Sequence, residues 1–323
     1  MDKKNEKLVF ISYLRATSVI FILLCHYTNM SQNSYVHMSA QFFNVGNDIF
    51  FIISGFCFGM QNFRSGKIKD WYKKRIRRIF IPYEVMLAAL LIVTIARGGD
   101  IDIMDWGRQI IGMQGWHGVH GAGHTWFITS LLLCYLITPL LDIIIEEIKS
   151  INLIICFIVF PIVITYGLSN IFEEPTLIIP ICWYSIAFIL GKNYLLFTIN
   201  SKKCIAALGI MVISILVRLF ARMILDGTVV YNVIISGYTH AVLAFGMLFL
   251  FAYMFRNCKE ILGVKYLNKL SYEIYLWDYM FVGGPISLFG KTTCWITDCI
   301  LVTVVSIIVA YGSNRIVARL VHV

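Results

Sequence analysis

The chain has 323 residues, of which 59% are hydrophobic and 14% are charged, and its mean hydropathy is +0.78. Soluble domains are usually about half apolar, with about a quarter of their residues charged. The composition therefore excludes an ordinary soluble domain and indicates a polytopic membrane protein. The net charge of +9 follows from basic residues placed between apolar segments, so nucleic-acid binding is not expected. The nine cysteines stand singly, without a CxxC pair, as small hydrophobic residues do.

Apolar stretches long enough to cross a bilayer recur along the whole chain. They predict an all-α fold of about ten transmembrane helices, in one membrane domain over residues 1–323, with no cleaved signal peptide and no appended soluble domain. The expected segments are about 8–29, 42–63, 79–97, 125–145, 151–169, 175–197, 203–225, 229–255, 268–290 and 294–318. Gly237 suggests a break in the eighth segment, and Gly283-Gly284-Pro285 interrupts the ninth. Residues 98–123 form the one long loop.

The distribution of Lys and Arg predicts the orientation. With the N-terminus placed inside, most of the 27 basic residues fall in cytoplasmic segments, including the run from Arg64 to Arg78. An even number of helices with both termini in the cytoplasm follows.

The first segment carries Arg15 and His26 within its apolar stretch. Eleven residues make about three full turns, so both side chains share one helix face and lie about 16 Å apart along the axis. An intramembrane Arg is by default a functional-site hypothesis. The alternatives are that Arg15 extends to the near interface and that His26 lies at the far headgroup boundary.

Asp48 enters the second segment at about the depth of His26. A carboxylate beside an imidazole fixes its tautomer and raises its basicity, which suits a general base. We therefore predict that Asp48 orients His26. The alternative is that Asp48 and Asn47 cap the helix at the interface.

Five motifs follow one another along almost the whole chain. They are Tyr13-Leu14-Arg15-Ala16 followed by His26, Asn47-Asp48-Ile49-Phe50-Phe51-Ile52-Ile53-Ser54-Gly55-Phe56, Lys74-Arg75-Ile76-Arg77-Arg78-Ile79-Phe80-Ile81-Pro82-Tyr83, His124-Thr125-Trp126-Phe127-Ile128 with Tyr135 and Pro139, and Ser271-Tyr272-Glu273-Ile274-Tyr275-Leu276-Trp277. In this order the motifs resemble those of the acyltransferase-3 family, integral membrane enzymes that O-acylate cell-surface and secreted glycans.

The resemblance implies transfer of an acyl group, most often acetyl, from cytoplasmic acyl-CoA to a hydroxyl of a glycan or glycolipid at a bacterial cytoplasmic membrane. His26 would be the base and Asp48 its orienting carboxylate. Arg15 would contact either a CoA phosphate or the developing oxyanion. No metal cofactor is implied.

One position departs from the family pattern. Asp278 stands where the family often has His, and Glu273 lies about one turn earlier. On the expected helix both lie at depths that Arg15 could reach, and an Arg–carboxylate pair would offset the cost of burying Arg15. Asp278 and Glu273 are therefore candidate counter-ions of Arg15, with substrate contact as their other possible role.

The basic run before the third segment has two interpretations. Topology and attraction to anionic lipid explain it fully. The sharper interpretation is a phosphate clamp for CoA, because forked Arg donors match phosphate geometry, with Arg75, Arg77 and Arg78 as the candidates.

The long loop carries three histidines, His117, His120 and His124. Glycines between them argue against a metal site. A loop that contacts the acceptor sugar, with Trp106 and Trp116 as stacking surfaces, and a plain interfacial loop remain open. His124 and Trp126 are the candidate substrate residues. Arg218 and His240 lie inside apolar segments and are expected to bond neighbouring helices rather than to catalyse.

Two other function classes fit parts of the pattern. A transporter or flippase for a lipid-linked sugar, amino acid or acyl group would also use many helices and intramembrane charges, although no inverted repeat is detectable. A non-catalytic sensor or assembly subunit is the third class.

Overall fold

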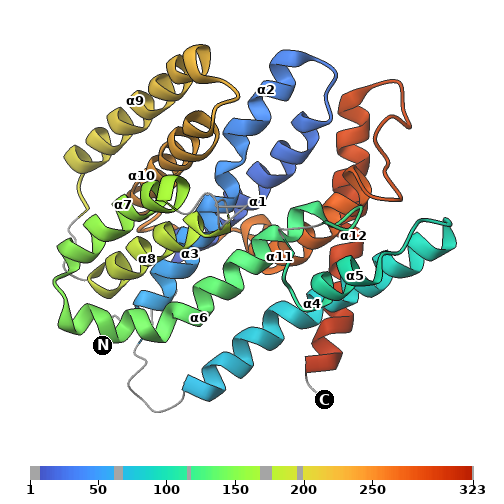
Figure 1. Ribbon diagram of the computed structural model, residues 1–323, viewed down its shortest axis with the longest axis horizontal. Coiled ribbons are helices and arrows are strands. Elements are labelled where there is room, and N and C mark those ends of the chain that lie inside the picture. Colours follow the sequence, from blue (N-terminus) through green and yellow to red (C-terminus); the bar gives the residue numbers. More distant parts are fainter. Residues whose placement is uncertain (1–7, 62–67, 115–117, 168–176, 195–198, 322–323) are drawn as a thin grey trace. The chain divides into compact units, whose positions relative to one another are not determined.

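The computed structural model describes residues 8–61, 68–114, 118–167, 177–194 and 199–321, and all of its regular elements are helical (Figure 1). The elements are α1 (Val9–Asn29), α2 (Ser34–Phe43), α3 (Val45–Gly59), α4 (Ile68–Ala96), α5 (Ile103–Ile110), the 3-10 turn η2 (Gly123–Thr125), α6 (Trp126–Glu147), α7 (Ser150–Gly167), α8 (Ile179–Lys192), α9 (Ser201–Leu225), the π-helix η5 (Val230–Ile235), α10 (Ser236–Met254), α11 (Leu262–Val282) and α12 (Trp295–Val321). The predicted all-α fold is confirmed for the described residues.

Seven helical stretches in the described part of the chain are long and apolar enough to cross a membrane. They are Val9–Asn29, Ser34–Gly59, Ile68–Ala96, Gly123–Glu147, Ser201–Leu225, Val230–Met254 and Trp295–Leu320. Several expose large apolar side chains, among them Leu216, Phe220 and Met223 of α9, which is the surface that a lipid environment favours. The count of about ten spans and the cytoplasmic position of both termini stay predictions.

Several predicted segments differ from the helices that form. Segment 79–97 corresponds to α4, which begins eleven residues earlier, at Ile68, and the expected loop 98–123 contains the short helix α5. Segment 42–63 covers the end of α2 and then α3, with Asn44 between them. Segment 229–255 begins as a π-helix and becomes the α-helix α10 at Ser236, close to the break expected at Gly237. Segment 268–290 is replaced by α11, which begins six residues earlier, at Leu262, and ends before Gly283. Each side chain of α11 therefore lies about 9 Å farther from the start of its helix than the predicted segment implied.

The described residues group into two compact units, each with its own internal contacts. The first comprises Met1–Ser18, Val45–Gly66 and Leu133–Lys265, and the second comprises Val19–Asn44, Lys67–Leu132 and Tyr266–Val323. In the first unit, α3 packs on α8 and α10, and α9 lies beside α10 (Figure 1). In the second unit, α4 packs on α12.

Glycines allow the close packing of α3 on α8 in the first unit. A Cβ atom at Gly59 would overlap the carbonyl oxygen of Phe188, and one at Gly191 would overlap that of Phe56. Small residues let two helix backbones approach closely in membranes, where dispersion contacts replace the hydrophobic effect between helices. Gly55 makes the same kind of contact one turn earlier on α3.

Candidate active site

His26 lies in the last turns of α1, and its imidazole is held by the carboxylate of Asp278 on α11. The distance from His26 Nδ1 to Asp278 Oδ2 is 2.8 Å. The side chain of Asp278 is completely buried, whereas 13% of the His26 side chain stays exposed. A carboxylate accepts hydrogen bonds, so Nδ1 of His26 carries the proton in this pair. In the neutral imidazole the lone pair is then on the other ring nitrogen, Nε2, as a general base requires.

Hydroxyl groups from α1 and α12 hold the second oxygen of Asp278. Tyr27 donates to Oδ1 at 2.9 Å, and Ser306 lies 3.4 Å from the same oxygen. The hydroxyl of Thr303 lies 3.0 Å from that of Tyr27. A buried carboxylate needs such partners, because an unpaired one would be strongly destabilising. Asp278 is thus fixed in position on both oxygens.

Asp48, the partner of His26 that the sequence suggested, has its own neighbours in the first unit. Asp48 is in the first turn of α3, in the first unit, where its Oδ2 is 3.6 Å from His240 Nδ1. The positive charge of Arg218 on α9 also acts on it. Each member of the predicted His26–Asp48 pair thus has a different partner within its own unit. Side-chain depth alone suggested that pair, whereas the packing of α3 against α10 turns Asp48 toward His240.

The structure also gives the two carboxylates of α11 partners other than the predicted Arg15. Asp278 pairs with His26 and Tyr27, and the Oε1 atom of Glu273 accepts from the side-chain amide of Asn314 at 2.6 Å. A contact of either carboxylate with Arg15, which belongs to the first unit, stays a prediction. A helix from residue 268 would place Asp278 about 15 Å along its axis, whereas the observed start at Leu262 places it about 24 Å along.

His124 joins the same cluster from the η2 turn. Its ring centre lies 6.2 Å from that of His26 and 5.1 Å from that of Tyr279, on which it stacks. The Tyr279 ring is also 5.2 Å from His26 and meets it edge-on. The sequence assigned His124 to substrate contact through its motif, but gave no sign that it meets His26.

A glycine shapes the chain just before His124. Gly121 has a φ of +87°, and a Cβ atom there would lie 2.8 Å from Pro285 Cδ. Both the positive φ and the close approach require glycine. Tyr275 then donates a hydrogen bond to the carbonyl oxygen of His124 and anchors the turn on α11.

The remaining predicted residues lie outside the His26 cluster or at its edge. Arg77 and Arg78 are exposed on α4, while Arg75 is half-buried with its guanidinium 5.9 Å from the Trp71 ring centre. Trp126 begins α6 and packs edge-on against Phe127. Arg15 is half-buried on α1. The roles given to these residues stay predictions. Trp116 and His117 of the long loop lie outside the described residues.

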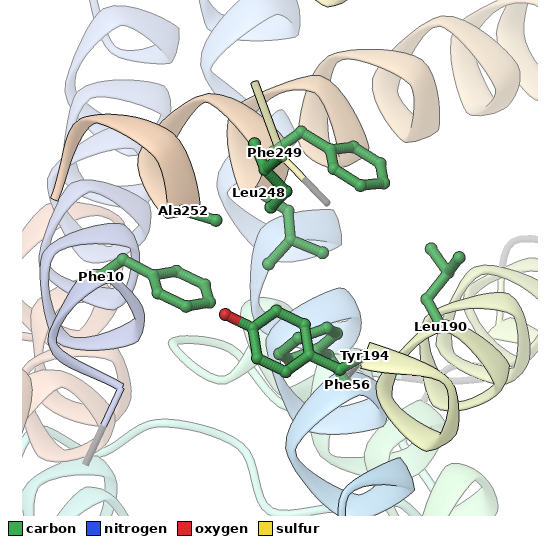
Figure 2. Close-up of a pocket in the computed structure, with 8 residues that line it drawn as sticks. Phe10, Phe56, Leu190, Tyr194, Leu248, Phe249 and Ala252 are labelled. Carbon is green, nitrogen blue, oxygen red and sulfur yellow. The ribbon is translucent and has the colours of Figure 1, made fainter. Parts of the chain in front are cut away.

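Over the described ranges, no three His, Cys, Asp or Glu side chains gather as a metal site would require. A small pocket in the first unit is lined by Phe10, Phe56, Leu190, Tyr194, Ile199, Leu248, Phe249 and Ala252 (Figure 2). Its walls are almost entirely hydrocarbon, and they offer neither a base nor a charged group. The chemistry available in the described residues is therefore concentrated around His26.

Comparison with known proteins assigns the chain to a family. The acyltransferase domain model of the acyltransferase-3 family matches residues 8–315, which is nearly the whole chain. No curated protein and no solved structure matches it. The matched region contains His26, His124 and Asp278 as well as all the candidate membrane spans except the last residues of α12. The chain therefore belongs to the acyltransferase-3 family and is a multi-pass membrane acyltransferase.

Proposed function

We propose that this protein is an O-acyltransferase that moves an acyl group, most often acetyl, from cytoplasmic acyl-CoA to a hydroxyl of a cell-surface glycan or glycolipid. We place it in the cytoplasmic membrane of a bacterium. The observation that carries the proposal is the 2.8 Å hydrogen bond between His26 and Asp278 in a chain of this family. That bond leaves one imidazole nitrogen ready to accept the proton of an alcohol.

The reaction is direct acyl transfer. The acceptor oxygen attacks the thioester carbonyl carbon while its proton passes to Nε2 of His26. The tetrahedral oxyanion then collapses, the C–S bond breaks, and the CoA sulfur leaves with the proton that His26 returns. Asp278 stabilises the imidazolium that exists between these two transfers, as a buried carboxylate beside a catalytic histidine does. Asp278 is the position at which the family often has His.

Basic residues on α4 and α1 are suited to bind the phosphates of the acyl donor, acyl-CoA. Arg77 and Arg78 are exposed in the first half of α4, and Arg75 lies less than one turn before them. Forked guanidinium donors match the phosphates of CoA. Arg15 and His26 belong to one continuous helix and are about 16 Å apart along it. This separation favours a contact of Arg15 with CoA over a contact with an oxyanion beside His26.

Purified protein in detergent tests the proposal. Labelled acetyl-CoA and a surface polysaccharide are supplied, and acetyl transfer to the polysaccharide is measured. His26→Ala is expected to lower the rate by about 10²–10⁴-fold, the usual contribution of a general base. His37→Ala is the matched control, because His37 is an exposed histidine on α2.

Two outcomes would contradict different parts of this account. Full activity of His26→Ala would remove the mechanism and leave the enzyme class standing. A wild-type protein that neither hydrolyses nor transfers acetyl from CoA in detergent, where transport cannot occur, would favour the transporter class instead.

A further inference from the structure

His124 is a buried histidine with one ring nitrogen in use and one open. Only 6% of the residue is exposed. Its Nε2 lies 3.2 Å from the carbonyl oxygen of Leu276 on α11. Among the described residues, no group forms a hydrogen bond with Nδ1. A buried nitrogen without a hydrogen bond is energetically unfavourable, so Nδ1 is expected to accept a hydrogen bond from a bound ligand.

The partner of Nε2 determines the tautomer of His124. A carbonyl oxygen only accepts hydrogen bonds, so Nε2 must carry a proton. A second proton on the ring is disfavoured, because burial opposes the charged form of the imidazole. His124 is therefore neutral, and its Nδ1 is a hydrogen-bond acceptor.

Packing holds this acceptor in place. The ring stacks on Tyr279 at 5.1 Å and meets Tyr275 at 5.0 Å. The hydroxyl of Tyr275 also donates to the main-chain oxygen of His124. A preorganised side chain suits a residue that selects substrates, because the side chain loses little conformational freedom when the substrate binds.

The cluster thus presents two acceptor nitrogens, Nε2 of His26 and Nδ1 of His124. A hydroxyl carries one proton, so the reacting hydroxyl that donates to His26 cannot also donate to His124. The two ring centres are 6.2 Å apart, a separation that one acceptor with hydroxyls on adjacent carbons can bridge with one hydrogen bond to each ring. Sugars carry such pairs of hydroxyls on adjacent carbons.

We infer that His124 is a specificity-determining residue whose Nδ1 accepts a hydrogen bond from the hydroxyl adjacent to the one that is acylated. The site then prefers acceptors with two neighbouring hydroxyls over acceptors with an isolated one. This inference rests on the proposed function, because it needs His26 to take the proton of the reacting hydroxyl.

The test compares two acceptors that differ by one donor. The acetylated sugar is identified from the product of the wild-type assay, and its methyl glycoside is compared with the derivative in which the adjacent hydroxyl is methylated. The ether keeps the oxygen and loses the proton. The wild type is expected to show a kcat/KM about 10- to 100-fold higher for the diol, the usual penalty for an unpaired buried polar group.

Two variants of His124 sharpen the test. His124→Phe keeps a flat ring and removes the acceptor, so the preference for the diol should fall to within about threefold while the KM for acetyl-CoA stays unchanged. His124→Asn keeps an acceptor oxygen near the position of Nδ1 and should restore part of the preference. If His124→Phe does not fold, the preference of His124→Asn for the diol still tests the inference. His37→Phe is the control for histidine replacement at an exposed position.

The outcomes separate the inference from the function. Equal rates for the diol and the ether in the wild type would overturn the inference while acyl transfer itself stands. A preference that survives in both His124 variants would do the same. A raised KM for acetyl-CoA in His124→Phe, with the diol preference intact, would mean that an amide N–H of the donor occupies Nδ1. A wild-type enzyme that does not acetylate the methyl glycoside would also contradict the inference, because two adjacent hydroxyls would then not be enough for recognition of the acceptor.

Discussion

Each of the two units contains a histidine next to a carboxylate, and the two pairs differ in geometry. In the second unit, Nδ1 of His26 is 2.8 Å from Asp278, within hydrogen-bond range. In the first unit, Nδ1 of His240 is 3.6 Å from Asp48, beyond that range. The hydrogen bond to Asp278 fixes the orientation of the His26 ring. Asp48 and His240 form no such hydrogen bond and interact mainly through their charges.

The surroundings of the two pairs reinforce this difference. Asp48 has the positive charge of Arg218 acting on it, and Arg218 is itself buried and bonded to Ser236. Among the described residues, the hydrogen-bond partners of Asp278 are hydroxyl groups and His26. A carboxylate that is balanced by a guanidinium contributes to folding, and one that is balanced by a histidine can take part in proton transfer. Buried charge in a membrane helix therefore does not by itself identify the catalytic centre.

The sharpest test of the comparison is to neutralise each carboxylate. Asp278→Asn should lower kcat by about 10²–10⁴-fold, because the amide no longer fixes the tautomer or stabilises the imidazolium. Asp48→Asn should act mainly on the melting temperature, since its partners are structural. Acetyl transfer and thermal unfolding are measured for both. A larger loss of kcat in Asp48→Asn than in Asp278→Asn would reverse the assignment of the two centres.

The second test removes the positive charge of Arg218, which lies in the first unit. Arg218→Met removes the positive charge that acts on Asp48 and the hydrogen bond to Ser236, and the free energy of unfolding should fall by about 1–3 kcal/mol, as for a lost hydrogen bond to a charged group. Arg222→Met on the same helix is the control. Arg222 is 3.9 Å from the exposed carboxylate of Asp226, so its loss should cost about 1 kcal/mol or less. Unfolding is followed in detergent, and equal effects of the two variants would contradict a structural role for Arg218.

A third prediction concerns the packing that holds the first unit together. Gly191→Ala would place a methyl group against the carbonyl oxygen of Phe56, so it should destabilise the protein by about 1–3 kcal/mol. Gly209→Ala on α9 is the matched control, because no atom lies within 4 Å of its added Cβ. That variant should be neutral or slightly stabilising, since alanine is the better helix former. A melting temperature that drops equally in both would show that close helix approach is not the cause.

The smallest expected effect tests the donor residues. The double variant Arg77→Ala/Arg78→Ala should raise the KM for acetyl-CoA by about 3- to 10-fold with little change in kcat, because exposed charge–phosphate contacts are weak and affect binding more than chemistry. Arg319→Ala is the control, an exposed arginine at the end of α12. A KM that responds to salt in the wild type but not in the double variant would support the contact. An unchanged KM for acetyl-CoA in the double variant would contradict the contact with CoA. These arginines would then serve only membrane topology and attraction to anionic lipid.

Much of the fold followed from the sequence because apolar length and glycine placement act locally. The stretch from Leu8 to Asn29 predicted α1 almost to the residue, and Gly237 lies next to the change from π-helix to α-helix at Ser236. Helix starts within polar segments were less certain. The amphipathic beginning of α11 carries lysines, so hydropathy placed its start six residues late.

The sequence by itself determined the membrane class and the family, because composition and motif order are properties of the chain. Only the tertiary structure decided which carboxylate serves His26. Asp278 is 252 residues away from His26 in sequence, and its depth depends on where α11 begins. The meeting of His124 with His26 was likewise decided by the turn at Gly121 and its anchor on α11. Spacing within one helix is fixed by the helical repeat, whereas contacts between distant segments depend on packing, which no local pattern encodes.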